Sequence, residues 1–509
     1  MPELGEKLHA LCEQHEGPLL LAGAVVAVLL RCALAPFPYS GEGKPPMHGD
    51  FEAQRHWMEI TTALPVAQWY QNSTDNDLLY WGLDYPPLTA YHSFALGRVG
   101  HALVPACFAL HSSRGHESAP CRLFMRASVV LSDLAVYLPG ALCAVRGFAS
   151  ERERASVRVA TVLGLWCLPP LLVIDHGHFQ YNGVCFGLCL AAAGCVAARR
   201  TLLASVFFTS GLLFKQIALY YAPAFFFGIL AHCLRPPGGV AVAAGRVAVT
   251  GVVVLGTVAA LFAPWLATAT PVASAAQVLH RMFPFARGLY EDKVANVWCS
   301  ISVVVKLQRL VPARRLPLLC ALATLAALAP ACACCLRPRQ SGKGAFAAAL
   351  TASAFAFFLF AFQVHEKSVL YPCVAACLLP VAMGPHRRPA WLAAALCHFL
   401  LVCMFSMYPL FVKDKLQGAY ALLCIPMMLL SEALPAAPLL RAAFRASYAL
   451  ALAIHGVHAL VPAPARYPDI WTLMITAPSC GYFVLCWGGI TAAQLWGAFE
   501  PPSEVDKTD

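Results

Sequence analysis

Acidic, basic and aromatic side chains gather in a few short segments of this 509-residue sequence. The first segment is GDFEAQRHW at 49–57, and WGLDYPP at 81–87 follows it between two apolar runs. A carboxylate can remove a proton from an attacking hydroxyl group, and Lys, Arg and His can hold a phosphate. Aromatic rings such as those of Trp57, Trp81 and Tyr85 can cover the face of a sugar. These residue types together fit glycosyl transfer from a lipid-phosphate donor.

Four more polar segments lie between or at the ends of later apolar runs. They are DHGHFQYN at 175–182, Lys215 with Gln216, RMFPFARGLYEDK at 281–293 and HEK at 365–367. Any one of them could be a solvated helix end. Ionisable residues at membrane depth cost about 2.5 to 3.5 kcal/mol each on insertion scales, so several of them together indicate a polar site.

Other functions use similar residues. His176 and His178 could bind a metal ion with Asp175, but two histidines separated by one residue in a helix do not share a face, and we expect no metal. The sequence favours a lipid-phosphate donor over a nucleotide-sugar donor, because it has no DxD-like pair with a nucleotide-binding domain. A transporter also places charges within the membrane, and composition does not exclude one. The long acidic and aromatic segment after the first apolar run argues against a transporter.

The elements that position these segments are predicted to be transmembrane helices. Hydrophobic residues make up 59% of the chain and charged residues 12%, whereas an ordinary soluble domain is about 25% charged. Apolar runs of bilayer-spanning length recur, and each must cross as a helix because lipid offers the backbone no hydrogen-bond partner. The net charge of +10 comes from short Lys and Arg clusters between these runs, which is typical of topology signals. The 22 cysteines lie mostly inside apolar runs, where a thiol packs as a small hydrophobic group.

We predict an all-α polytopic membrane protein that forms a single domain over residues 1–509. Residues 39–121 form a long first lumenal loop, whose second half, 88–110, suits a helix lying at the membrane interface. This loop holds Asn72, the acceptor of the only N-x-Ser/Thr site in the chain. About fourteen spans are expected, near 18–38, 122–146, 157–174, 179–198, 201–214, 217–234, 245–266, 316–336, 344–363, 368–384, 390–411, 416–434, 441–462 and 470–496.

The basic clusters orient these spans. Short cytoplasmic loops are enriched in Lys and Arg, and a cytoplasmic N-terminus puts most of the basic clusters inside and all the polar segments outside. This arrangement requires residues 267–315 to form a loop with a partial or re-entrant helix on the far side. Arg309, Arg314 and Arg315 in that loop break the rule. A complete span at 296–312 would invert everything that follows it.

The polar segments also resemble, in wording and order, those of one enzyme family. The family is the dolichyl-phosphate-glucose-dependent α-1,3-glucosyltransferases of N-glycan assembly, and the resemblance runs from about residue 49 to 370. Members that add the first glucose and members that add the second share the Asp-Tyr-Pro-Pro and His-Glu-Lys elements. The sequences of these segments are more similar to those of the first-glucose enzymes. The matching segments are GDFEAQRHWMEIT, YWGLDYPPLTAYHS, DHGHFQYN, FKQIALYYAP, FPFARGLYEDKVANVWC and FQVHEKSVL.

The resemblance implies a C-type glycosyltransferase fold in the endoplasmic reticulum membrane, with a lumenal active site. It implies an inverting reaction with no cofactor and no required metal. Dolichyl-phosphate glucose would be the donor, and a dolichol-pyrophosphate-linked nine-mannose oligosaccharide would be the acceptor. The expected partners are therefore these lipids and the bilayer, with no nucleic acid.

The resemblance also carries Asp50 over as the family's catalytic base. Glu52 is its nearest rival, and local structure separates the two. The side chains of residues i and i+2 lie on the same face of an extended segment, whereas in a helix their directions differ by about 200°.

Asp84, His365 and Glu366 match the family's donor-site positions. We add Lys367 and His365 as candidates for holding the phosphate, because buried cations act strongly where water is excluded. Glu366 and Asp84 would orient sugar hydroxyls or their neighbours. The additional candidates are Glu52, Arg55, Lys215, Arg287 and Lys293.

Overall fold

In a computed structural model, the described part of the chain forms helices and no strand. The described residues are 2–235, 238–283, 293–337 and 342–499. Among them, eight helices are long and apolar enough to cross a membrane, and three shorter apolar helices accompany them. The prediction of an all-α polytopic membrane protein is therefore confirmed, whereas the count of fourteen spans is not.

The eight long apolar helices include several that are built from consecutive shorter elements. They are α1 (Pro2–Leu34), α4 with η3 and α5 (Ala119–Phe148), α6 with α7 and η4 (Ala155–Phe179), η5 with α10 (Gln216–Leu234), α11 (Gly239–Leu266), η6 with α15 (Ala313–Leu336), α16 (Lys343–Phe360) and α23 (Ile470–Leu495). The other helices of the bundle are α8 (Asn182–Ala197), α9 (Thr201–Leu212), α17 (Leu370–Ala376), α18 (Leu379–Ala382), α19 (Leu392–Ser406), α20 (Tyr408–Lys413), α21 (Gln417–Ala433) and α22 (Pro438–Leu460).

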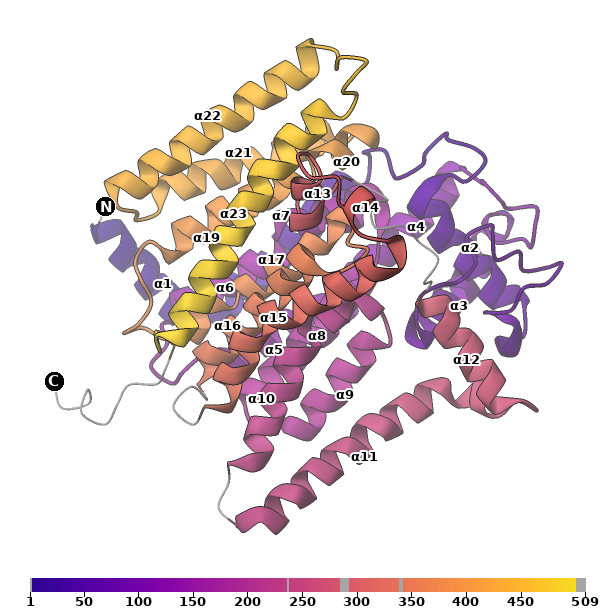
Figure 1. Ribbon diagram of the computed structural model, residues 1–509, viewed down its shortest axis with the longest axis horizontal. Coiled ribbons are helices and arrows are strands. Elements are labelled where there is room, and N and C mark those ends of the chain that lie inside the picture. Colours follow the sequence, from indigo (N-terminus) through magenta and orange to yellow (C-terminus); the bar gives the residue numbers. More distant parts are fainter. Residues whose placement is uncertain (1, 236–237, 284–292, 338–341, 500–509) are drawn as a thin grey trace.

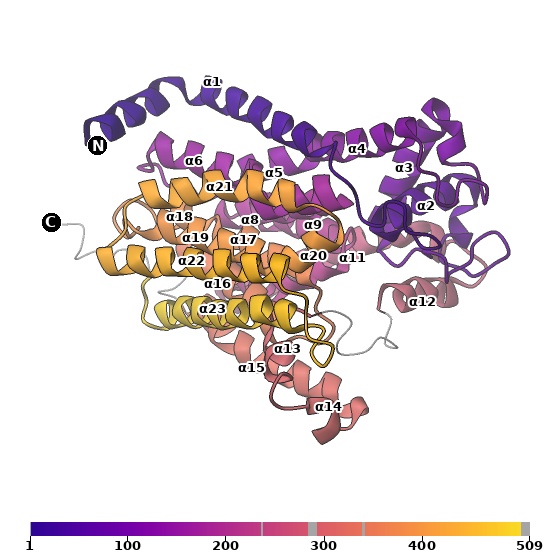
Figure 2. The same cartoon turned by 90° about the horizontal axis from the view of Figure 1, so that it is seen from above.

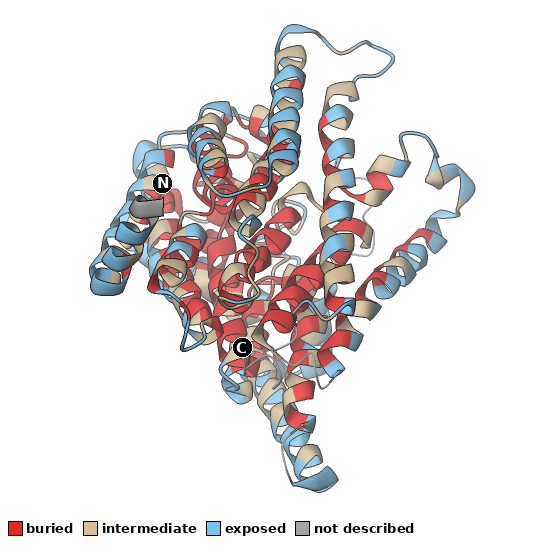
Figure 3. Cartoon of the chain, turned by 90° about the vertical axis from the view of Figure 1, so that its left-hand side faces the viewer, coloured by how far each residue is buried: buried red, intermediate tan, exposed pale blue. Residues whose placement is uncertain are grey.

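The middle of the bundle is tightly packed because small residues let the helices approach one another. A Cβ atom at Gly140 of α5 would clash with the backbone of Gly187 in α8, and one at Gly187 would clash with the backbone of η3, just before α5. α16 is mostly buried, whereas few residues of α11 are buried. Figure 3 shows the buried residues gathered in the middle of the bundle and the exposed ones on the outer helices.

A separate group of helices lies at one end of the bundle. It contains α2 (Gly49–Ala63), α3 (Pro87–Leu103) and α12 (Pro271–Met282), which lie beside one another in both Figure 1 and Figure 2. An aromatic cluster attaches this group to the end of α11, where the ring of Trp265 lies 5.4 Å from that of Tyr70 and 6.2 Å from that of Trp69 between centroids. α1 begins at the opposite end of the bundle.

Two sequence predictions about connections can be compared with this fold. The expected helix at 88–110 is α3, which begins at Pro87, a residue that favours the first helical turn. The expected loop at 267–315 contains α12 and two short helices, α13 (Val297–Ile301) and α14 (Leu307–Leu310), so no complete span forms at 296–312. The side of the membrane on which these segments lie stays a prediction.

One pair of cysteines departs from the packing role that the sequence suggested. Cys107 and Cys121 form a disulfide whose Cα atoms are 5.6 Å apart. It joins the turn after α3 to the first residues of α4. The other cysteines in the described part of the chain are free thiols.

Candidate active site

Asp50 is the second residue of α2 and lies where several distant segments meet. Its Oδ2 atom accepts hydrogen bonds from Gln180 Nε2 at 2.7 Å and from Lys367 Nζ at 2.5 Å. Nε2 of His178 lies 2.8 Å from the same oxygen. The side chains of Asp50 and Lys367 are each 24% exposed, so a substrate can reach both charges.

The charges around Asp50 keep it ionised. Burial alone would raise the pKa of the Asp50 carboxyl. The charge of Lys367 and the hydrogen bond from His178 outweigh burial and hold this pKa well below its usual range. Burial would lower the pKa of Lys367, but the charges of Asp50 and Glu366 raise it above its ordinary value. At neutral pH the pair is therefore a carboxylate and an ammonium.

His178 connects Asp50 to a second carboxylate. Its Nδ1 atom lies 2.5 Å from Oδ2 of Asp414, the residue that follows α20. The side chains of His178 and Asp414 are only 3% and 2% exposed. We call Asp50, His178, Gln180, Lys367 and Asp414 the Asp50 site.

The backbone around Ser40 aligns Asp50 with His178. The N–H of Ser40 donates to the carbonyl oxygen of His178 at 2.9 Å, and the hydroxyl of Ser40 accepts from the N–H of Asp50 at 3.3 Å. One residue in the connection between α1 and α2 thus contacts both partners. Asp50 and His178 are 128 positions apart in the sequence, so this tie fixes a contact that no local element could make.

The segment that carries His178 has an unusual backbone. Residues Val173–Phe179 form the π-helical turn η4, a conformation that often occurs at functional sites. Arg126 of α4 donates to the carbonyl oxygens of both His176 and Gly177, the latter at 2.9 Å. These bonds satisfy carbonyl groups of a widened turn and hold it in place.

The neighbouring polar residues of η4 bind other partners. Nε2 of His176 lies 2.9 Å from Oδ2 of Asp133, which also accepts from Nε of Arg31 at 2.7 Å. Asp175 accepts from the side-chain amide of Asn182 at 2.7 Å. His176, His178 and Asp175 therefore do not converge on one point. Within the described residues, no cluster of three His, Cys, Asp or Glu side chains could hold a metal ion.

Lys215 extends the Asp50 site. Its Nζ donates to Asn182 Oδ1 at 2.6 Å and to Gln180 Oε1 at 3.4 Å, while the amide nitrogen of Gln180 binds Asp50. Burial and the nearby charge of Lys367 lower the pKa of Lys215 to about 8. The structure thus brings this additional candidate next to the predicted base.

Asp84 and the aromatic residues border the same region. The pKa of Tyr85 is raised first by burial and then by the charge of Asp84, with a further contribution from Asp50, so both carboxylates lie near its hydroxyl. The rings of Tyr85 and Trp57 are 4.8 Å apart between centroids, and Trp57 Nε1 donates to the carbonyl of Trp81 at 2.8 Å. The three aromatic residues that the sequence suggested for covering a sugar therefore contact one another.

The HEK motif follows the connection after α16 and runs into η8 (Glu366–Val369). Lys367 is the member of this motif that contacts Asp50. His365 is the extended residue before η8. Oε2 of Glu366 is buried and has no hydrogen-bond partner among the described residues, which leaves it able to accept one from a substrate.

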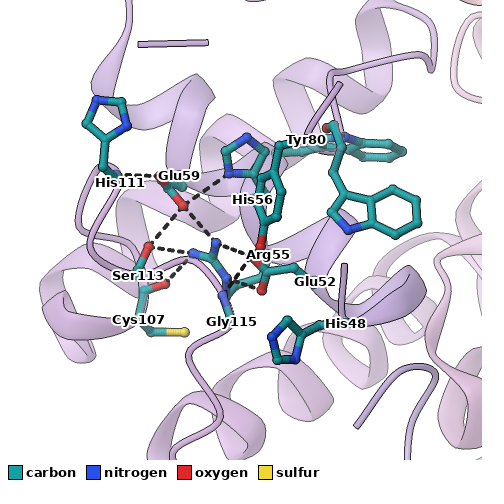
Figure 4. A network of polar contacts seen from close by, with 12 residues as sticks. His48, Glu52, Arg55, His56, Glu59, Tyr80, Cys107, His111, Ser113 and Gly115 are labelled. Atoms are coloured by element: carbon teal, nitrogen blue, oxygen red, sulfur yellow. Dashed lines mark hydrogen bonds and ion pairs between the residues drawn. The ribbon is translucent and has the colours of Figure 1, made fainter. Parts of the chain in front are cut away.

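Glu52 and Arg55 belong to a different cluster on α2. In Figure 4 the Arg55 guanidinium lies between two glutamates, donating to Glu52 at 2.6 and 2.7 Å and to Glu59 at 2.7 Å. It also donates to Ser113 Oγ at 2.6 Å and to the carbonyl of Cys107 at 2.8 Å. We call Glu52, Arg55, Glu59 and Ser113 the Arg55 network.

The loop that leads from α3 to α4 completes this network. Glu52 accepts from the N–H of Gly115 at 3.1 Å, and Glu59 accepts from the N–H of His111 at 2.8 Å. Tyr80 donates to Glu52 at 2.8 Å. Because α2 is helical at this point, Glu52 and Asp50 diverge, and Glu52 is directed into the protein.

The two remaining candidates lie elsewhere. Arg287 falls outside the described residues. Lys293 forms an ion pair with Asp469 at 3.3 Å, and both side chains are about half exposed. Its partner is thus not a member of the Asp50 site.

Sequence reasoning missed three members of the Asp50 site in their present roles. His178 was considered only as a metal ligand, Gln180 only as part of a motif, and Asp414 not at all. Asp414 does carry a signal, because it is an acidic residue in the short break between the apolar runs 390–411 and 416–434. An ionisable residue at such a junction indicates a partner across the bundle.

Comparison with known proteins identifies similar chains. A sequence model described as the ALG6, ALG8 glycosyltransferase family matches residues 27–489. A Drosophila melanogaster protein named probable dolichyl pyrophosphate Man9GlcNAc2 alpha-1,3-glucosyltransferase is 39% identical, over 92% of this chain and 98% of its own length. The Gallus gallus protein named dolichyl pyrophosphate Man9GlcNAc2 alpha-1,3-glucosyltransferase is 37% identical, over 94% of this chain and 97% of its own length. The Saccharomyces cerevisiae protein of the same name is 40% identical, over 78% of this chain and 71% of its own length.

Proposed function

Because the chain belongs to the ALG6, ALG8 glycosyltransferase family, we propose that it transfers glucose from dolichyl-phosphate glucose to the terminal mannose of dolichol-linked Man9GlcNAc2, forming an α-1,3 linkage. The observation that carries this proposal is the shared name of relatives that match more than three quarters of the chain. That name states the acceptor and the linkage. Neither the second-glucose reaction nor a transporter is favoured, since these relatives are named for the Man9 acceptor.

The reaction needs one displacement. A β-linked glucosyl phosphate becomes an α-glucoside when the 3-hydroxyl of mannose attacks the anomeric carbon from the opposite side. The new bond forms from mannose O3 to glucose C1, the bond from C1 to the phosphate oxygen breaks, and its electron pair leaves with dolichyl phosphate. Asp50 takes the proton from the attacking hydroxyl as general base. Its carboxylate state and its partial exposure support this role.

Lys367 links the base to the leaving group. In the structure its ammonium is bound to Asp50 at 2.5 Å. A donor phosphate beside it attracts the same ammonium, and any shift of Lys367 toward the phosphate weakens its interaction with Asp50. The carboxylate then binds a proton more readily, because the pKa of an acid rises when a neighbouring cation withdraws. Donor binding thus activates the base.

The other proposed donor contacts surround these two charges. Glu366 offers a buried oxygen to a sugar hydroxyl, and the charge of Asp84, like that of Asp50, acts on the Tyr85 hydroxyl. His365 precedes Lys367 and shares the phosphate. Lys215 supports the amide of Gln180, which orients Asp50.

We propose that the site faces the lumen of the endoplasmic reticulum. The disulfide between Cys107 and Cys121 supports this side, since disulfides persist in oxidising compartments. Asn72 is exposed in the same segment. A single cysteine introduced at residue 72 should react with an impermeant thiol reagent only when the lumenal face is open. Labelling from the cytoplasmic face would contradict the arrangement.

An assay with purified protein tests the function. The protein in detergent is given synthetic dolichyl-phosphate glucose and a lipid-linked Man9GlcNAc2 acceptor, and the product is analysed for one added glucose in α-1,3 linkage. UDP-glucose in place of the donor should give no product. Product only from an acceptor that already carries one glucose would assign the second-glucose reaction instead. Absence of product from both acceptors would contradict the proposal.

A further inference from the structure

A cavity lined by basic side chains lies between α9, α10 and α11. It has a volume of about 710 Å³, and its lining includes Arg199, His232, Arg235 and Arg246. A smaller hollow of about 130 Å³ shares Arg199 and His232 with it and adds Lys343. Among the described residues, no aspartate or glutamate lines either space. We call the larger space the arginine cavity.

α9 separates the arginine cavity from the Asp50 site. Its first two residues, Thr201 and Leu202, line the cavity, whereas Lys215, just beyond its other end, binds Gln180 of the Asp50 site. The 12 residues of α9 span about 18 Å at a rise of about 1.5 Å per residue. In Figure 1 the end of α10 and the start of α11 lie at the bottom, away from α2. With the Asp50 site facing the lumen, as proposed above, the arginine cavity lies at the cytoplasmic leaflet.

The positive charges in this cavity act on one another. Arg235 donates to the carbonyl oxygens of Cys335 at 2.7 Å and Arg337 at 2.9 Å, which are neutral acceptors and leave its charge uncompensated. Burial lowers the pKa of the Arg235 guanidinium, and the charge of Arg199 lowers it further. An anion in the cavity would replace this repulsion by attraction.

Neutral donors border the same space. Nδ1 of His232 is buried and has no hydrogen-bond partner among the described residues. α9 begins at Thr201 beside the cavity, and the side chain of its N-cap residue, Arg200, makes no capping hydrogen bond. The N–H groups of a first helical turn attract anions, and guanidinium groups bind phosphate through paired hydrogen bonds. The donors of the cavity therefore fit a phosphate group.

Arg199 occupies a backbone position that favours glycine. It follows α8 with a φ of 59°, and the N–H of Arg200 closes the turn by donating to the carbonyl oxygen of Cys195 at 2.7 Å. Glycine is usual at such a position, because the Cβ atom of any other residue is crowded there. An arginine that stands there despite this strain indicates a use for its side chain.

The apolar wall of the cavity indicates that the phosphate belongs to a lipid. Leu202 of α9 and Val242 and Val249 of α11 line the cavity and are exposed. Few residues of α11 are buried in the protein, so this long apolar helix is left to contact acyl chains. Anionic lipids are present in cytoplasmic leaflets, and basic pockets between transmembrane helices bind their head groups.

We propose that the arginine cavity binds the phosphate head group of an anionic phospholipid from the cytoplasmic leaflet, whose acyl chains lie along α9 and α11. Arg199 comes from the turn between α8 and α9, Arg235 from the end of α10 and Arg246 from α11, so one phosphate joins three elements. This site lies apart from the proposed donor contacts. Lipid binding needs no glucose transfer, so the inference goes beyond the proposed function.

The experiment measures dissociation constants for the full chain in detergent by native mass spectrometry. The probes are phosphatidylinositol, phosphatidylcholine with the same acyl chains, and inositol phosphate without chains. Phosphatidylinositol should bind more tightly than phosphatidylcholine, because only its head group carries a net negative charge. Inositol phosphate should bind much more weakly than phosphatidylinositol, because it lacks the chains that contact the apolar wall.

Three single variants then locate the binding site. Arg199→Gln and Arg246→Gln should each weaken phosphatidylinositol binding about fivefold, as expected when one arginine near an anionic lipid is lost. Arg200→Gln is the matched control, because it removes the same charge from the adjacent position and Arg200 does not line the cavity. This variant should keep the wild-type dissociation constant. If Arg199→Gln does not fold, Arg246→Gln decides, since Arg246 is an exposed residue of α11.

Four results would overturn the site. Equal affinity of the wild type for the two phospholipids, or unchanged binding in both Arg199→Gln and Arg246→Gln, would contradict it directly. Equal weakening in Arg200→Gln would mean that only diffuse surface charge attracts the lipid. Inositol phosphate binding as tightly as phosphatidylinositol would assign a soluble phosphate ligand instead. Failure of the proposed function is recognised separately, because these measurements involve no turnover.

Discussion

Two carboxylates near the start of α2, Asp50 and Glu52, lie in very different surroundings. Glu52 is enclosed in the Arg55 network, where its side chain is 2% exposed and its two oxygens accept from Arg55, Tyr80 and Gly115. Asp50 faces the other way, remains 24% exposed, and binds Lys367.

The difference separates a structural network from the proposed reactive site. Charges that are buried and fully paired hold a structure in one arrangement, because losing any partner leaves a buried charge alone. Charges that remain partly open can exchange one partner for a substrate. The Arg55 network therefore anchors α2, and the Asp50 site uses the helix that the network holds. Residue type does not distinguish the two carboxylates, whereas the location of their partners does.

The largest effect is expected from substitution of Asp50, the carboxylate of the Asp50 site. Asp50→Asn keeps the shape of the side chain but removes the proton-accepting charge, and kcat should fall about 10²- to 10⁴-fold. The protein should still fold and bind donor, which a binding assay with dolichyl-phosphate glucose measures. Asp50→Glu should also be impaired, because catalytic geometry tolerates little displacement.

Glu52→Gln is the matched control, and it should affect unfolding more than turnover. The base would be reassigned to Glu52 if this variant lost activity while Asp50→Asn kept it. Normal turnover in both variants would refute the mechanism.

The second effect is expected from a substitution that disrupts the Arg55 network. Arg55→Met leaves Glu52 and Glu59 buried without a countercharge and should lower the free energy of unfolding by about 3 to 5 kcal/mol. Thermal unfolding in detergent measures the change, and the fraction that remains folded should keep most of its kcat. Arg445→Met is the control, since that ion pair with Glu432 lies on the surface and its loss should leave Tm unchanged. A loss of kcat without a loss of stability in Arg55→Met would place Arg55 in the catalytic machinery.

The third effect concerns the partner that Asp50 exchanges. Lys367→Ala removes a charge-assisted hydrogen bond worth about 1.5 to 3 kcal/mol, so kcat should fall roughly ten- to a hundredfold, with a smaller change in donor affinity. Steady-state kinetics with varied donor concentration separates the two. His365→Ala should give a weaker effect in the same direction. Full activity in both variants would show that these side chains only solvate a helix end.

The fourth effect distinguishes the two regions by their response to acid. Burial raises the pKa of Glu59, but hydrogen bonding to His56 and the charge of Arg55 lower it to about 2 from an ordinary value of 4.5. A carboxyl group with a depressed pKa in the folded state stabilises the protein above its unfolded pKa and loses that contribution as pH falls through the folded value. Stability should therefore decline between about pH 4.5 and pH 2. In Glu59→Gln, unfolding curves should show a shallower decline over that range.

The smallest effect is expected at Lys293. Its ion pair with Asp469 is about half exposed, and such pairs contribute about 0 to 1 kcal/mol. Lys293→Ala should leave both kcat and Tm near the wild-type values. A large loss of turnover would mean that the reactive region extends to Lys293.

Much of the membrane architecture follows from composition, since only helices satisfy a backbone in lipid. The sequence did not predict how many helices cross, because several apolar runs are broken. The run at 368–384, for example, is divided between η8, α17 and α18. Short helices of this kind depend on packing across the bundle, which periodicity does not record.

The candidate site was predictable where one segment held all the information. Asp50 and Lys367 stand in distinctive motifs, and the structure brings them together. His178 and Asp414 were missed because their roles arise from a contact between residues 236 positions apart. Glu52 could not be separated from Asp50 until the backbone between them was known to be helical.

The long separations within the Asp50 site set an order of events during synthesis. Asp50 leaves the ribosome 317 residues before Lys367, which at roughly 5 to 20 residues per second is about 16 to 63 s. The Arg55 network, by contrast, contains only residues between 52 and 115, and it can form as soon as that stretch has been made. α2 can therefore be anchored early, whereas Asp50, the proposed base, gains all its partners only after Asp414 has been added.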